Sequence, residues 1–176
     1  NRRYGHGGYK YTPGRWSNAA KKIIKNYRLK SNSRILDVGC GKGFLLKEIK
    51  NILPEIQIAG FDISKYAIKN SHSDIKKFLF NHDVRKKFPF KKNYFDLVIS
   101  INTLHNLNLY DLSFALSECQ RVAKKKYIVI ESFRNEQELF NLQCWALTCK
   151  SFFSPEEWKW IFRRNNFNGD YEFIYF

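Results

Sequence analysis

Short apolar runs alternate with amphipathic segments along most of the chain. The runs RILDV, QIAGFDI and YFDLVISI predict strands, and the last is long enough to be buried on both faces of a sheet. FLFNHD, KYIVIESF and YEFIYF predict three more strands. Residues 44–53 and 111–123 carry apolar side chains at helical spacing. Strands that alternate with helices predict an open, mostly parallel sheet.

Several helix starts carry a local signal. Ser17 and Ser64 each precede a segment with helical spacing, so both are predicted to cap helices. The segment SPEEWKWIFRRNNF places Ser154 before Pro155, with Glu157 completing a capping box. The stretch NEQELFNLQCWALTC fits a helix or a strand, and its pattern does not decide between them.

Side chains suited to a nucleoside come directly after three successive predicted strands. Glycines at 39, 41 and 43 follow the first strand, and glycine lets a backbone turn sharply and approach a ligand closely. Asp62 follows the second strand, where a carboxylate can accept hydrogen bonds from both hydroxyls of a ribose. Asp83 follows the third strand and is suited to accept from an adenine amine. Three such groups at three strand ends predict a nucleoside-containing ligand.

The glycine spacing selects among nucleoside ligands. Dinucleotide sites favour G-x-G-x-x-G, but here the third position is Phe44 and the glycines run G-x-G-x-G. No phosphate-binding G-x-x-x-x-G-K-[ST] motif occurs in the sequence. Asp37, directly before the turn, would repel a pyrophosphate and attract an ammonium group. S-adenosylmethionine fits, because it carries positive charge and has no phosphate.

These segments resemble a known family, the class I S-adenosylmethionine-dependent methyltransferases. ILDVGCGKGF resembles the family's first motif, GFDIS its second, HDVRKKFPF its adenine-side segment and FDLVISINTLHNL its fourth strand. The resemblance implies that Asp37, Gly39 and Gly41 hold the methionine part of the cofactor, Asp62 the ribose and Asp83 the adenine. The other residues expected to contact the cofactor are Cys40, Gly43, Ile63, Val84 and Ser100.

The resemblance also implies a fold. We expect an α/β, three-layer, Rossmann-like methyltransferase fold with a mostly parallel sheet of six to seven strands and an antiparallel strand near the C-terminus. A seventh strand would come from residues 143–150 or be missing. The expected organisation is a single domain over residues 1–176, with a cofactor half at 33–90 and a substrate half at 91–176. Residues 1–16, glycine-rich and aromatic, are expected to form a lid or a packed arm.

Two residues are candidates for the chemistry at the acceptor. His105 follows the fourth strand and is a candidate general base for a hydroxyl acceptor, or a histidine that packs against the cofactor or caps the next turn. Glu131 ends the fifth strand and would bind or deprotonate substrate, or be a satisfied carboxylate at the sheet edge. The segment after strand four has no proline, which disfavours amino-methylation of DNA bases.

Composition and charge bear on the partners. The net charge is 31 − 16 = +15, and a positive charge of this size is compatible with a nucleic-acid partner. The lysines are, however, scattered along the chain as doublets and triplets. We therefore interpret the charge as a feature of the overall composition and not as a binding surface. The four cysteines are not spaced as metal ligands usually are, so no metal is expected. Free thiols in the cytoplasm are the simplest prediction for them. No apolar run reaches the roughly 20 residues of a membrane span, and no signal peptide is visible. The chain contains no Met, so we expect that a preceding segment exists.

The sequence therefore predicts an O- or N-directed methyltransferase acting on a small molecule, with a sugar or surface-polysaccharide precursor as one candidate. An RNA methyltransferase that uses the basic surface is the first alternative. A non-catalytic, methyltransferase-like subunit of a complex is the second. The oligomeric state is left open by the sequence.

Overall fold

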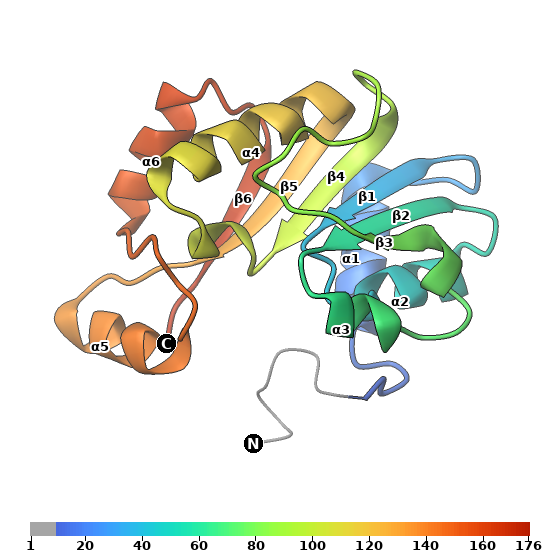
Figure 1. The fold of residues 1–176 in the computed structure, drawn as a ribbon, viewed down its shortest axis with the longest axis horizontal. Coiled ribbons are helices and arrows are strands. Elements are labelled where there is room, and N and C mark those ends of the chain that lie inside the picture. The colour runs from blue at the N-terminus through green and yellow to red at the C-terminus, as the bar shows by residue number, and fades with distance from the viewer. Residues whose placement is uncertain (1–9) are drawn as a thin grey trace. The chain divides into compact units, whose positions relative to one another are not determined.

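The computed structural model describes residues 10–176, and the chain divides into two compact units, residues 1–83 and 84–176. Each unit contains three strands (Figure 1). The strands are β1 (Arg34–Val38), β2 (Gln57–Asp62), β3 (Leu79–Asn81), β4 (Phe95–Ile101), β5 (Ala123–Glu131) and β6 (Asp170–Ile174). The helices are α1 (Ser17–Tyr27), α2 (Phe44–Ile52), α3 (Lys65–Lys69), α4 (Leu109–Val122), α5 (Glu136–Trp145) and α6 (Pro155–Arg164). The chain therefore has the strand–helix alternation of an α/β Rossmann-like fold, as the sequence predicted.

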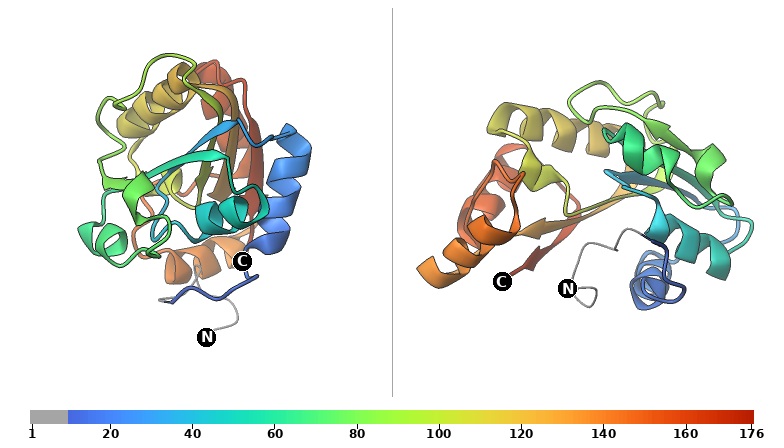
Figure 2. Two further views of the ribbon diagram at one scale, coloured as in Figure 1. Left: turned by 90° about the vertical axis from the view of Figure 1, so that its right-hand side faces the viewer. Right: turned by 60° about the horizontal axis from the view of Figure 1, so that its bottom comes forward.

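The first unit has the strand order β3-β2-β1, and both of its strand pairings are parallel. Gly60 lies in β2, and a Cβ there would come within 2.8 Å of both Leu46 and Leu79, so the missing side chain lets α2 pack closely on the strand. α1 and α2 lie side by side (Figure 2). The parallel pairing brings the carboxyl ends of three strands to one edge, which is where ligands bind in such sheets.

The second unit has the strand order β4-β5-β6, again with parallel pairings. Its core is one apolar cluster in which Leu112 and Leu116 of α4 and Trp158 of α6 pack with Ile128 and Ile130 of β5. Alternate residues of a strand point to opposite faces, so Ile128 and Ile130 define the face of β5 that α4 and α6 cover. The helical spacing of the apolar residues in α4 follows from this arrangement, because Leu112, Ala115 and Leu116 all belong to the cluster.

The C-terminal strand corrects one prediction. β6 runs parallel to β5, with Tyr127 opposite Asp170 and Glu131 opposite Ile174, so the expected antiparallel strand is wrong. Between β5 and β6 the chain forms α5 and α6. This connection brings the chain back so that β6 begins next to the N-terminal half of β5. Residues 143–150 form no strand, since α5 ends at Trp145 and turns come after it. The described chain therefore has six strands.

The cap predictions are confirmed at two helices and wrong at one. The Ser64 hydroxyl accepts from the amide of Ala67, and Ser154 and Glu157 form a complete capping box. Ser17 does not cap α1, because it already lies within the helix and its amide donates to the carbonyl of Gly14. None of the helices in residues 10–176 combines the length and the apolar character needed to cross a membrane.

Candidate active site

Backbone hydrogen bonds gather three strand ends in the first unit. The amides of Gly39 and Cys40 both donate to the carbonyl of Phe61, at 2.9 and 3.0 Å. The amide of His82 donates to the carbonyl of Asp62 at 3.1 Å. The glycine turn, the Asp62 carboxylate and the segment that leads to Asp83 therefore lie at the same edge of the sheet, as the sequence predicted.

The glycine turn has the backbone that its sequence suggested. Gly39, Gly41 and Gly43 have φ angles of 78°, 54° and 72°, a region that other residues rarely adopt. A Cβ at Gly41 would have no atom within 4 Å, so this glycine borders open space. At Gly43 a Cβ would come within 2.7 Å of Ile75 and Leu79. Gly41 thus leaves room for a ligand, whereas Gly43 leaves room for packing.

Asp62 connects the glycine turn with the end of β2. Its Oδ2 accepts from the amide of Gly41 and its Oδ1 from the amide of Ser64, each at 2.8 Å. These two bonds fix the plane of the carboxylate. Each oxygen retains acceptor capacity, because a carboxylate offers about four lone-pair sites. Two oxygens held in this way match two neighbouring ribose hydroxyls.

Asp37 is a buried carboxyl with an unusual acidity. It is 5% exposed, and burial together with the nearby charge of Asp62 raises the pKa of Asp37 to about 8. A cation at this position would stabilise the ionised form and lower that pKa, whereas a phosphate would add a third negative charge. The residues of this edge therefore fit S-adenosylmethionine, which combines a ribose with positive charges.

The other predicted cofactor residues divide between the two units. Ile63 follows Asp62 and is 62% exposed, an apolar surface against which a base ring can pack. Cys40 lies in the glycine turn, and burial raises the pKa of its thiol well above the usual value. Val84 and Ser100 belong to the second unit, where Val84 packs against the apolar core and Ser100 lies buried in β4.

The structure brings the two candidate catalytic residues together in the second unit. His105 Nε2 lies 3.4 Å from Glu131 Oε2, and the residues are 3% and 1% exposed. Burial raises the pKa of Glu131, and hydrogen bonding from Trp145 partly opposes this. A carboxylate beside Nε2 favours a proton on that nitrogen, which leaves Nδ1 as the atom that accepts a proton.

The segment 146–151, which sequence reasoning did not assign to the site, holds the backbone around His105. The amides of Lys150 and Ser151 donate to the carbonyl of His105 at 2.9 and 3.0 Å. The Ser151 hydroxyl donates to the carbonyl of Leu107 at 2.6 Å. Thr148 makes a further hydrogen bond, to Asn106. The bonds to the His105 carbonyl come from backbone amides, so no side-chain pattern in the sequence indicates them.

No group of three or more His, Cys, Asp or Glu side chains within residues 10–176 is arranged to hold a metal ion. The four cysteines are free thiols.

The fold and the sites of the two units define a Rossmann-like α/β protein of the methyltransferase type. The chain belongs to the methyltransferase domain family, whose model matches residues 29–166. The cofactor of this family is S-adenosylmethionine. The match covers part of each unit and includes all the predicted cofactor-binding and catalytic residues.

Relatives with different activities share this domain. The chain is 33% identical over 110 residues to the mouse arginine-hydroxylase NDUFAF5. The aligned region covers 62% of the chain and 31% of that protein. It is 40% identical over 76 residues to a malonyl-[acyl-carrier protein] O-methyltransferase of Legionella pneumophila. This match covers 41% of the chain and 26% of that protein. The chain thus spans between a quarter and a third of the length of these curated relatives.

A solved structure confirms the fold. A SAM-dependent methyltransferase from Aquifex aeolicus superposes with a TM-score of 0.61 at 20% sequence identity, over 88% of this chain and 82% of that one. At 20% identity this similarity shows that the two proteins share a fold, but it does not show that they methylate the same acceptor.

Proposed function

We propose that this protein transfers a methyl group from S-adenosylmethionine to an oxygen or nitrogen atom of a small molecule. The observation that carries the proposal is the edge of the first unit, where the Asp62 carboxylate is fixed by two backbone amides beside a buried Asp37. A sugar or surface-polysaccharide precursor is the acceptor to assay first.

The residues of the first unit would hold the cofactor. Asp62 accepts hydrogen bonds from the ribose, Asp37 with Gly39 and Gly41 faces the methionine part, and Asp83 accepts from the adenine amine. Cys40, Gly43 and Ile63 belong to the same unit as this edge, whereas Val84 and Ser100, the other two residues that the sequence predicted, belong to the second unit. When bound, the cofactor supplies an electrophilic methyl group on its sulfonium.

His105 and Glu131 would act on the acceptor. Glu131 orients the imidazole through Nε2, and Nδ1 accepts the proton of an acceptor hydroxyl as it attacks. Segment 146–151 keeps the His105 backbone in place through the hydrogen bonds to its carbonyl. Both side chains are almost fully buried, so water has little access to them.

An RNA methyltransferase is the second candidate, favoured by the net charge of +15. Our proposal predicts that a short structured RNA binds weakly, with a steep loss of affinity between 50 and 200 mM salt and no preference for sequence, because background charge acts through phosphates alone. Fluorescence anisotropy with two RNAs of unrelated sequence measures this. Sub-micromolar binding that persists at about 200 mM salt would favour RNA as the acceptor.

Cofactor binding is predicted to depend on the protonation of Asp37. Below pH 8 the cofactor-free protein holds Asp37 mostly protonated, and a bound cation favours the carboxylate, so binding releases a proton. The affinity for S-adenosylmethionine should rise with pH, by at most about tenfold per unit, and level off above about pH 8. Calorimetric titrations at several pH values measure this.

The Asp37→Asn variant is the control for this prediction, since it keeps the size of the side chain and removes its titration. Comparing the two proteins cancels any titration of the ligand itself. In two buffers of different ionisation enthalpy, the wild type should release a fraction of a proton at pH 7 that the variant does not. Equal proton release by both would place the titrating group elsewhere.

We further propose a cytoplasmic location, supported by four free thiols in the structure. The name of NDUFAF5 places that relative in mitochondria, so the proposal needs its own test. Cell fractionation followed by immunoblotting should recover the protein with cytosolic markers, and recovery with an organelle or membrane fraction would contradict the proposal.

A further inference from the structure

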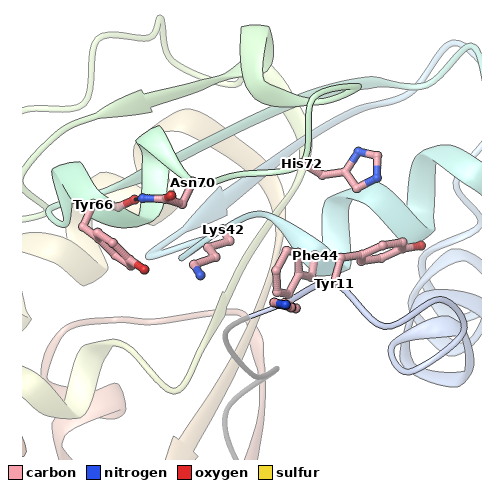
Figure 3. A pocket seen from close by; sticks show the side chains of 7 residues that line it. Tyr11, Lys42, Phe44, Tyr66, Asn70 and His72 are labelled. Carbon is pink, nitrogen blue, oxygen red and sulfur yellow. Dashed lines mark hydrogen bonds between the residues drawn. The ribbon is translucent and has the colours of Figure 1, made fainter.

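An apolar groove lies in the second unit, between the start of α4 and the helix α6. It has a volume of about 450 Å³ and is open to solvent. It is lined by the apolar and aromatic residues Leu109, Phe153, Trp160 and Ile161, and by the charged residues Glu156, Glu157 and Arg163. The cavity in Figure 3 is a different one, which includes Lys42 of the glycine turn and so belongs with the site described above. The α4–α6 groove contains none of the predicted cofactor or catalytic residues.

The groove presents an aromatic side chain to solvent on a preformed floor. Trp160 is 55% exposed and Leu109 is 45% exposed. Phe153 packs edge to face on the buried Trp158, with ring centroids 5.3 Å apart, so the floor of the groove is continuous with the core. Tryptophan and arginine contribute most often to the energy of protein interfaces. An exposed Trp160 beside the exposed Arg163 is therefore typical of a surface that another protein covers.

The exposed side of α6 carries its charges in a fixed order. Glu156 lies in the first turn, Arg163 lies in the last turn, and Trp160 lies between them. These residues are four and three positions apart, so they form one row along the helix. Glu156 pairs with Lys159 at 2.6 Å, but the Glu156 side chain is 77% exposed and its carboxylate can accept from a second cation. The row thus runs from acidic through aromatic to basic.

The order of charges selects the partner. A uniformly acidic or uniformly basic partner would be attracted to one end of the row and repelled by the other end. A second copy of the chain has the complementary order when it runs in the opposite direction. In a two-fold arrangement each Glu156 then faces the partner's Arg163, and the two Trp160 side chains meet near the axis.

We propose that two copies of this chain associate through antiparallel α6 helices, with their α4–α6 grooves facing each other. The net charge of +15 supports this face over the rest of the surface, because lysine-rich surfaces repel a second copy and α6 carries both signs. The exposed apolar residues of the row are few, so we expect a small and reversible interface. This self-association is independent of the methyl acceptor, and its failure would leave the proposed function intact.

Sedimentation equilibrium at up to about 1 mM protein tests the association. The wild type should approach twice the mass of the single chain as its concentration rises. Trp160→Ala should weaken the association by about tenfold or more. Phe140→Ala, which removes an exposed ring of α5, is the matched control and should associate as the wild type does. A wild type that keeps the mass of one chain throughout, or equal losses in both variants, would overturn the proposal.

Charge reversal tests the antiparallel direction. Glu156→Arg alone places two arginines at each symmetric contact, and Arg163→Glu alone places two glutamates there, so each variant should associate at least about tenfold more weakly than the wild type. In an equimolar mixture of the two variants every contact again joins an arginine and a glutamate. The mixture should therefore form a dimer with one copy of each variant.

The double variant Glu156→Arg/Arg163→Glu exchanges the two charges and should associate nearly as the wild type does. Recovery in the mixture and in the double variant cannot come from misfolding of a single variant, and circular dichroism checks the helix content of each protein. Wild-type association of either single variant, or a mixture and a double variant that both stay monomeric, would contradict the proposed pairing.

Discussion

Replacing His105 by alanine is expected to lower the rate of methyl transfer by about 10²- to 10⁴-fold. A hydroxyl attacks far better as its proton leaves, and the variant removes the imidazole that would accept this proton. Binding of S-adenosylhomocysteine should stay within about threefold of wild type, since the proposed cofactor carboxylates belong to the first unit. Single-turnover assays with labelled cofactor and calorimetric titrations measure the two quantities separately.

Conservative variants distinguish proton transfer from packing. His105→Gln keeps a polar side chain but accepts no proton, so it should be nearly as slow as His105→Ala. Glu131→Gln keeps the contact with Nε2 without its charge, so its rate should fall less and the pH dependence of the rate should change. Tyr110→Ala, at an exposed position of the second unit, controls for general destabilisation. Full activity in His105→Gln would show that orientation, and not proton transfer, is the role of His105.

Replacing Asp62 by alanine is expected to lower the affinity for S-adenosylhomocysteine by about 10²-fold or more. The variant removes both acceptors for the ribose, and hydrogen bonds to a charged group contribute about 1.5–3 kcal/mol each. It also releases the amides of Gly41 and Ser64, so the glycine turn loses its hydrogen bond to the Asp62 side chain and keeps only the backbone bonds to Phe61. Calorimetry gives the affinity, and thermal unfolding with and without ligand gives an independent measure of it.

Two further variants make the Asp62 result specific. Asp62→Asn keeps one acceptor oxygen, so it should bind S-adenosylhomocysteine with an affinity between those of wild type and Asp62→Ala. Glu55→Ala removes an exposed carboxylate of the same unit and should bind as wild type. Wild-type affinity in Asp62→Ala would show that the ribose is held elsewhere.

The cofactor edge was predictable because its chemistry lies in short, contiguous motifs. Gly39, Gly41 and Gly43 require positive φ angles that the sequence itself signals, and the structure has them. Parallel strands carry their carboxyl ends to one edge, so the residues directly after each predicted strand were enough to bring Asp62 beside Gly41. The acidity of Asp37 was not predictable, because it depends on burial and on the distance to another carboxylate.

The end of the chain was harder to predict, for a physical reason. The direction of β6 depends on where α5 and α6 return the chain, and the sequence around residues 135–149 fits a helix or a strand. The contact between His105 and Glu131 joins the ends of two strands, and position alone did not show it. The hydrogen bonds from Lys150 and Ser151 to His105 use backbone groups, which no side-chain pattern reveals.

Transfer of a labelled methyl group tests the central claim most directly. The protein is incubated with methyl-labelled S-adenosylmethionine, a metabolite extract and total RNA, and the products are separated by ultrafiltration. The account predicts that a labelled small molecule distinct from S-adenosylmethionine forms and that its amount falls to background with Asp62→Ala. Label in the RNA fraction, or equal incorporation by wild type and Asp62→Ala, would contradict it.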